Sequence, residues 1–194
     1  WALVMAAMRR LPQYVGNLKH GAWQQSGLKS ASMPPNFGLG NVLRGKTLGI
    51  WGYGKIGQLV AGYGKAFGMQ VVVWGRLPSL QKAVADGFTA AESREDIFTR
   101  SDVLSLHVRL NEDTRNLVSA EDLARMKPTA LLVNTSRAAL IEPDALISAL
   151  NRRTSSRVGP GKSSANAVWA RSRVSTVVVM VVGQAGASIA GRSM

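Results

Sequence analysis

The stretch Thr47-Leu48-Gly49-Ile50-Trp51-Gly52-Tyr53-Gly54-Lys55-Ile56-Gly57 decides the fold class of this chain. Its first five residues are mostly apolar, which predicts a short buried strand, and three glycines follow at GxGxxG spacing. An apolar set at roughly helical spacing comes next: Leu59, Val60, Tyr63 and Phe67. A second apolar run at residues 71–74 completes a strand, glycine turn, helix and strand. This order and size are typical of a dinucleotide-binding βαβ unit.

Each glycine of this turn has a physical reason to be a glycine. Gly52 lets the chain turn sharply off the strand, Gly54 lets the backbone approach a pyrophosphate, and Gly57 lets the helix pack close to the sheet. The free N–H groups between Tyr53 and Ile56 then face the anion, assisted by the positive end of the helix dipole. The alternative is a tight strand-to-helix turn without a ligand, and the βαβ context favours the cofactor.

Composition indicates an ordinary globular domain. With 194 residues, 46% of them hydrophobic and 18% charged, the sequence suits one domain with a real core. It has no cysteine and only two histidines, which excludes disulfides and thiolate metal sites and disfavours a histidine-based metal site. No apolar run is long enough to span a membrane and nothing indicates secretion, so we expect a cytoplasmic protein. Because the chain starts at Trp1, we expect it to come from the middle of a longer protein.

Strand and helix patterns alternate through residues 47–150. This alternation predicts an α/β fold with a doubly wound parallel sheet of the Rossmann type, incomplete at its C-terminal end. We expect an NAD(P)-binding domain at 45–150. Residues 1–44 before it are expected to hold a helix, broken or kinked at Pro12, and an irregular crossing segment.

The elements expected beyond the first βαβ unit are helices near 79–85, 94–99, 120–126 and 143–150, and strands near 88–90, 103–106 and 130–133. Pro143 suits the first turn of the last helix. Glu142 and Asp144 beside it complement the dipole of that helix.

In a parallel sheet of this kind, the ligand lies beyond the carboxyl ends of the strands. Besides the glycine turn, those ends present Gly75-Arg76, His107-Val108-Arg109 and Asn134-Thr135-Ser136-Arg137. An NAD site usually places Asp or Glu near the position of Gly75, where it binds the ribose hydroxyls. Here the acid is missing and Arg76 follows, which can receive a 2′-phosphate. The pattern favours NADP over NAD, and the alternative is a solvated arginine in a permissive NAD site.

Arg137 stands in a loop of small residues after a predicted strand, so we expect its guanidinium to face the cleft. In that position it can grip a carboxylate in bidentate fashion and polarise a neighbouring carbonyl. On spacing alone, this interpretation is no better supported than the alternative, in which Arg137 is a surface arginine at the end of a strand.

Several motifs together resemble the D-isomer-specific 2-hydroxyacid dehydrogenases: residues 47–57, Gly68-Met69, Ser105-Leu106-His107, Met126-Lys127-Pro128 and Asn134-Thr135-Ser136-Arg137. The resemblance runs over residues 1–150. It implies a nucleotide domain inserted within a substrate-binding domain, NADP or NAD as cofactor, and a small 2-keto or D-2-hydroxy acid as substrate. It also implies that 1–20 is the helix entering the nucleotide domain, that 26–44 is often used in dimer contacts, and that the parent protein is a homodimer.

Pattern and resemblance together predict these cofactor-binding residues: Gly52, Gly54, Lys55, Ile56, Gly57, Gly75, Arg76, His107, Val108, Thr135 and Ser136. The resemblance implies that Gly75 occupies the place of the family's ribose-binding Asp, and that Thr135 and Ser136 line the nicotinamide end. It implies that Arg137 is the catalytic arginine that binds the 2-keto acid. Arg109 departs from the family pattern, which usually has proline at that place.

The proton donor of such a reaction is missing from this sequence. The resemblance implies a histidine held by a glutamate, both well beyond the arginine, yet after Leu150 this chain has no Asp, Glu or His. The family residue that matches His107 is not the base, so we assign His107 to the neighbourhood of the cofactor. We therefore predict a catalytically incomplete fragment that still binds cofactor. The alternative is a non-catalytic NAD(P)-sensing protein on the same fold, such as a corepressor.

Residues 151–194 differ from the rest of the chain. They hold seven of the 24 basic residues and none of the 11 acidic ones, so much of the net charge of +13 lies there. One interpretation is a nucleic-acid-binding tail, which the near absence of aromatic residues disfavours. Another is an extra strand at the apolar run 177–182. We favour a third, an out-of-frame translation after about residue 151, and expect a disordered basic tail.

Overall fold

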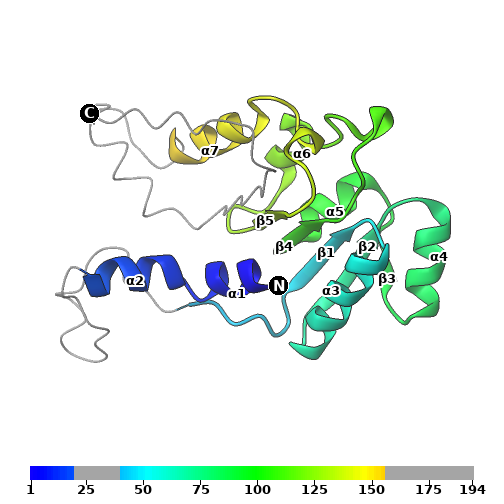
Figure 1. Ribbon diagram of the computed structural model, residues 1–194, viewed down its shortest axis with the longest axis horizontal. Helices are drawn as coiled ribbons and strands as arrows, with labels where there is room; N and C mark the ends of the chain where they lie inside the picture. Colours follow the sequence, from blue (N-terminus) through cyan, green and yellow to red (C-terminus); the bar gives the residue numbers. More distant parts are fainter. Residues whose placement is uncertain (20–39, 156–194) are drawn as a thin grey trace.

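The computed structural model describes residues 1–19 and 40–155. Its centre is a parallel sheet of five strands, namely β1 (Thr47–Trp51), β2 (Gln70–Trp74), β3 (Thr89–Ala90), β4 (Val103–Leu106) and β5 (Leu131–Asn134). Their order across the sheet is β3-β2-β1-β4-β5 (Figure 1). The chain winds outward from β1 to β3 and then returns to β4 on the other side of β1. The predicted doubly wound α/β fold is confirmed, with its switch point between β1 and β4.

Helices cover both faces of this sheet (Figure 1). They are α1 (Ala2–Met8), α2 (Leu11–Lys19), α3 (Lys55–Ala66), α4 (Leu77–Ala85), α5 (Arg94–Arg100), α6 (Ala120–Arg125) and α7 (Ala145–Ser155), with 3₁₀ turns η2 (Glu112–Thr114) and η3 (Ala138–Leu140). One core cluster joins the sheet to α1, α3 and α4, and the other joins it to α5, α6 and α7. All residues of β1, β4 and β5 are buried, which explains why these strands are continuous apolar runs with few polar residues.

The buried face of α3 differs from the apolar set in the sequence. Its buried residues are Gly57, Val60, Ala61 and Gly64. Leu59, Tyr63 and Phe67, which belong to the same apolar set as Val60, are exposed instead. A methyl group at Gly64 would lie 2.4 Å from the side chain of Leu48, which means that the helix approaches the sheet too closely for larger residues on that face.

Two further differences concern helix ends. The helix at the start of the chain is broken as predicted, but at Arg10, whose φ of 56° separates α1 from α2 just before Pro12. The last helix begins at Ala145, so Pro143 does not open it, and Asp144 has a φ of 59°. The carboxylate of Glu142 accepts a hydrogen bond from the N–H of Ala120, so it complements the start of α6 and not of α7.

Candidate functional site

The ends of β1, β2 and β4 meet at Gly52. Its N–H donates to the carbonyl of Trp74 at the end of β2 (2.9 Å), and the N–H of His107 after β4 donates to the carbonyl of Trp51 (2.8 Å). Gly52 has a φ of 98°, and a Cβ there would lie 2.8 Å from the carbonyl oxygen of His107. Both conformation and space therefore require glycine at this position.

Gly54 is the N-cap of α3, and no side chain caps this helix end. A Cβ on Gly54 would meet no protein atom within 4 Å, so the space in front of it is open. Lys55 and Ile56, the first residues of the helix, are exposed beside it. Uncapped N–H groups, a helix dipole and a missing side chain together suit a pyrophosphate, so the residues present fit the predicted cofactor.

Gly57 has a different neighbour from the one expected. A Cβ there would lie 2.2 Å from the carbonyl oxygen of Gly52 and 3.3 Å from the side chain of Ile50. The absence of a side chain at Gly57 therefore lets the start of α3 pack against the carbonyl of Gly52 within the turn, as well as against Ile50 of β1. The close approach farther along α3 belongs to Gly64, which sequence reasoning missed because it lies outside the GxGxxG pattern.

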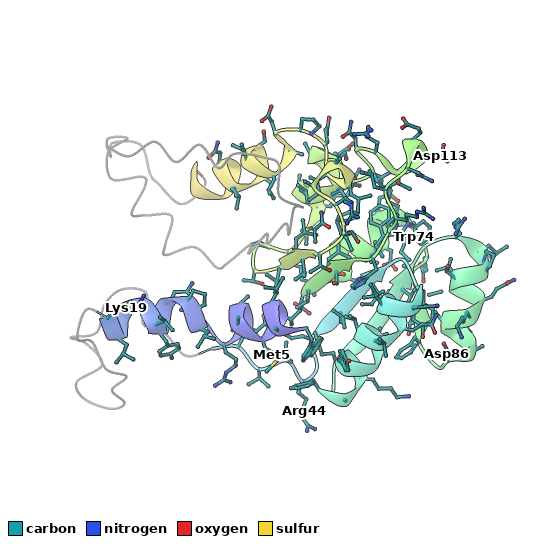
Figure 2. All side chains as sticks on the ribbon, in the orientation of Figure 1. Met5, Lys19, Arg44, Trp74, Asp86 and Asp113 are labelled. Atoms are coloured by element: carbon teal, nitrogen blue, oxygen red, sulfur yellow. The ribbon has the colours of Figure 1, made fainter. Side chains whose placement is uncertain are left out.

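Tyr53 points from the turn into the protein. Its side chain is 4% exposed, and its hydroxyl donates to Asp86 (2.9 Å), which follows α4 and is labelled in Figure 2. Burial, reinforced by the carboxylate of Asp86, raises the pKa of Tyr53 to about 12. The middle of the glycine turn is thus anchored on α4, which the sequence did not indicate.

Gly75 and Arg76 join β2 to α4. A Cβ on Gly75 would lie no closer than 3.6 Å to its neighbours, in ordinary contact, so the space admits an aspartate that the chain does not have. Arg76 is the exposed N-cap residue of α4. Within the described residues it forms no ion pair, so its charge is available to a ligand.

His107 follows β4 and is held by the strand itself, because its Nε2 lies 2.9 Å from Oγ of Ser105. Burial lowers the pKa of His107 to about 4. The ring is therefore neutral at pH 7. Val108 next to it packs against the α5, α6 and α7 core cluster, whereas Arg109 is exposed.

The loop after β5 is fixed by Asn134, which is fully buried. Its Oδ1 accepts from the N–H of Ser136 (3.0 Å), and its Nδ2 donates to the carbonyl of Arg137 (2.9 Å). Ser136 also donates to the carbonyl of Leu106 at the end of β4 (3.3 Å), while Thr135 is exposed. The guanidinium of Arg137 is exposed and donates to the carbonyl of Ser136.

The predicted residues thus gather at one edge of the sheet. Contacts around Gly52 join the ends of β1, β2 and β4, and Ser136 joins β5 to β4. No carboxylate of the described residues pairs with Arg137, and none of their His, Cys, Asp and Glu side chains are grouped to hold a metal ion. Over the same ranges, 1–19 and 40–155, no helix is long and apolar enough to cross a membrane.

Comparison with known proteins extends this picture. Residues 1–160 match the family model of the D-isomer specific 2-hydroxyacid dehydrogenase, NAD binding domain. A glyoxylate reductase from Aeropyrum pernix is 41% identical over 152 residues, which cover 77% of this chain and 44% of that protein. The chain therefore spans less than half the length of this curated relative.

Two solved structures are similar in both fold and sequence. An oxidoreductase from Ralstonia solanacearum has a TM-score of 0.70 and 68% identity, over 78% of this chain and 45% of its own. A phosphoglycerate oxidoreductase from Vibrio cholerae has a TM-score of 0.73 and 41% identity, over 93% of this chain and 56% of its own.

Proposed function

Because the chain belongs to the D-isomer specific 2-hydroxyacid dehydrogenase family, we propose that it is the cofactor-binding part of an enzyme that interconverts a 2-keto acid and a D-2-hydroxy acid. The observation that carries this proposal is the open, uncapped start of α3 at Gly54. Gly52, Gly54, Lys55, Ile56 and Gly57 would hold the pyrophosphate there. The bound nicotinamide would supply the hydride.

Alanine at Gly54 tests cofactor binding without disturbing the fold. The new methyl group meets no protein atom, but it occupies space that the pyrophosphate needs. We expect Gly54→Ala to weaken NADH or NADPH binding at least about tenfold, a loss of about 1.4 kcal/mol. Gly62→Ala is the matched control, since Gly62 lies on the same helix and its Cβ also meets nothing. Equal affinity of the two variants contradicts the proposal.

We propose that the cofactor is NADP in preference to NAD. Support comes from Arg76, which is exposed and unpaired within the described residues, and from the missing acid at Gly75. Charge-assisted hydrogen bonds to a 2′-phosphate contribute about 1.5–3 kcal/mol, so Arg76→Ala should weaken NADPH binding about tenfold or more and leave NADH binding unchanged. Tighter binding of NADH by the unmodified chain contradicts this preference.

For the substrate we propose a small 2-keto acid, with its carboxylate held by Arg137. Support comes from the exposed guanidinium at the end of β5, which pairs with no carboxylate of the described residues, and from the glyoxylate reductase and phosphoglycerate oxidoreductase among the similar proteins. Thr135, Ser136, His107 and Val108 would line the nicotinamide side of the site. Because the sequence after Leu150 has no Asp, Glu or His to serve as the acid, we expect no turnover of glyoxylate or hydroxypyruvate by the purified chain with NADPH or NADH. Measurable turnover contradicts this expectation.

We propose that the protein forms a homodimer, and that α3 contributes to its contact in addition to the crossing segment at 26–44 expected from the sequence. Leu59, Tyr63 and Phe67 form an apolar stripe on this helix, each at least 45% exposed, and the ring of Trp1 lies against Tyr63 and Phe67. The same stripe on a second copy can pack against it about a two-fold axis. Light scattering should give a dimer mass that falls to that of a monomer in Leu59→Glu, whereas Val84→Glu, on exposed α4, should leave it unchanged. A monomeric unmodified chain contradicts the proposal.

Other expectations from the sequence stay predictions. The cytoplasmic location and the origin of the tail at residues 151–194 are not tested by the described residues. Of this tail the structure describes only residues 151–155, which continue α7. The crossing segment at 26–44 is described only from residue 40 onward.

A further inference from the structure

Ser105, which is buried, and His107, which is half-buried, form a hydrogen-bonded pair near the glycine turn. They lie two residues apart on an extended segment, so their side chains emerge on the same face of the sheet. Ser105 is 3% exposed, and its Oγ lies 2.9 Å from Nε2 of His107. A buried serine hydroxyl facing an imidazole nitrogen raises the question of which atom carries the proton.

The surroundings of Ser105 answer this question. Within the described residues, the hydroxyl has no hydrogen-bonding partner except His107. A buried hydroxyl that does not donate its proton loses free energy, so donation to Nε2 is the arrangement that best satisfies this hydroxyl. Nε2 can accept only if the ring is neutral, and burial of His107 favours the neutral ring. The remaining proton of the imidazole then lies on Nδ1.

Nδ1 is left free by this arrangement. It makes no hydrogen bond within the described part of the chain, and it is not among the buried polar atoms that lack a partner there. Its N–H is therefore reached from outside the protein. The backbone of His107 lies against Gly52, so this residue stands beside the glycine turn at the switch point between β1 and β4.

We propose that Ser105 is a positioning residue, whose hydroxyl fixes His107 as the Nδ1–H tautomer so that this N–H can donate to the bound dinucleotide. The inference rests on the proposed cofactor function. It assigns His107 a role as a fixed neutral donor and not as the acid or base of the reaction. His107 follows β4, on the side of the switch point where this fold class binds the nicotinamide half, so that half is the expected acceptor.

Imidazole NMR of the full chain tests the tautomer directly. The sequence contains only His20 and His107, so a His20→Gln variant assigns the ring signals. We expect the Nδ1–H tautomer for His107 at pH 7, a shift toward Nε2–H in Ser105→Ala, and restoration in Ser105→Thr, which keeps the hydroxyl. Thermal unfolding of each variant checks that the fold is retained. An Nε2–H ring in the unmodified chain, or one that Ser105→Ala leaves unchanged, overturns the proposal.

Cofactor affinity tests the functional part of the inference, with energy transfer from tryptophan to NADPH or NADH as the signal. Loss of a neutral hydrogen bond corresponds to about a fivefold change, so Ser105→Ala should bind about fivefold more weakly and Ser105→Thr like the unmodified chain. Equal affinities in all three chains overturn the role of Nδ1–H. If the unmodified chain binds neither cofactor, the proposed function fails, and the ring spectra still decide whether Ser105 fixes the tautomer.

Discussion

The glycine turn after β1 and the loop after β5 lie on the same edge of the sheet, but they are held by different means. In the glycine turn, backbone meets backbone, with Gly52 against the carbonyl of His107 and Gly57 against that of Gly52. In the loop at residues 135–137, the buried side chain of Asn134 holds the backbone. The first region should therefore fail as a whole when one glycine gains a side chain. The second should loosen locally when its supporting side chains are removed.

The largest effect is expected for Gly52→Ala. The new methyl group would lie 2.8 Å from a backbone oxygen at a φ of 98°, so strain and overlap act together. We expect the free energy of unfolding to fall by about 3 kcal/mol or more, measured by chemical denaturation. Gly87→Ala is the control, since Gly87 has a φ of 80° but open space around it, and should lose only about 1 kcal/mol. Equal losses would mean that the approach of β4 does not constrain the turn.

The next largest loss of stability is expected when Arg94 is removed, because this arginine holds the segment that pairs with the chain just after the β5 loop. Arg94 donates to both carboxylate oxygens of Asp122 and to the carbonyl of Leu117, and Val118 pairs with the segment that follows Arg137. Asp122 is buried, so Arg94→Ala leaves a charge without its partner and should cost about 2–3 kcal/mol at pH 7, allowing for the partly exposed arginine. The control Arg125→Ala mainly removes an ion pair with exposed Glu121 and should cost under about 1 kcal/mol.

The loss of stability in Arg94→Ala should depend on pH. Burial opposes ionisation of Asp122, but hydrogen bonds from Arg94 and Ser119 outweigh it and lower the pKa of the carboxyl. A lowered pKa in the folded state contributes stability that is fully present above the unfolded pKa of about 4 and lost as the pH falls below it. The difference between the unmodified chain and Arg94→Ala should therefore shrink below about pH 4. A constant difference down to acid pH would show that Arg94 acts by packing against Trp51, over which it lies.

A third prediction tests the loop itself. Asn134→Ala removes two hydrogen bonds from a fully buried position and should lower the free energy of unfolding by about 2 kcal/mol. Hydrogen exchange should quicken at the N–H of Ser136, which loses its acceptor, while exchange in the glycine turn stays unchanged. Faster exchange in both regions would contradict the separation between them.

The same contrast explains how far the sequence alone could go. The parallel sheet followed from apolar runs and glycines because those patterns reflect burial within a few neighbouring residues. The buried face of α3 does not follow from its apolar set, because Leu59, Tyr63 and Phe67 are more hydrophobic than Gly57, Ala61 and Gly64 and yet are exposed. Close packing against the strands selects small residues there, and hydrophobic periodicity does not record this requirement.

Contacts between residues far apart in the chain also could not be predicted from the sequence. Glu142 was expected to complement the next helix along the chain, yet it meets the start of α6, 22 positions away from it in sequence. The hold of Asn134 on its loop is local, and an asparagine before small residues is a recognisable signal for it. The tie between Tyr53 and Asp86 carries no such signal, because only the fold brings the glycine turn to the end of α4.

Tyr53→Phe should give the smallest effect and tests whether the glycine turn needs any side chain. Loss of the hydrogen bond to Asp86 should lower the free energy of unfolding by about 1 kcal/mol at pH 7. The pKa of Tyr53 is raised to about 12, so its contribution is fully present below the ordinary pKa near 10 and lost as the pH rises toward 12. At pH 7 the unmodified chain should therefore have a higher free energy of unfolding than Tyr53→Phe, and chemical denaturation above pH 10 should show this difference shrinking. If cofactor affinity also falls in Tyr53→Phe, the turn depends on this side chain as the β5 loop depends on Asn134, and the contrast between the two regions narrows.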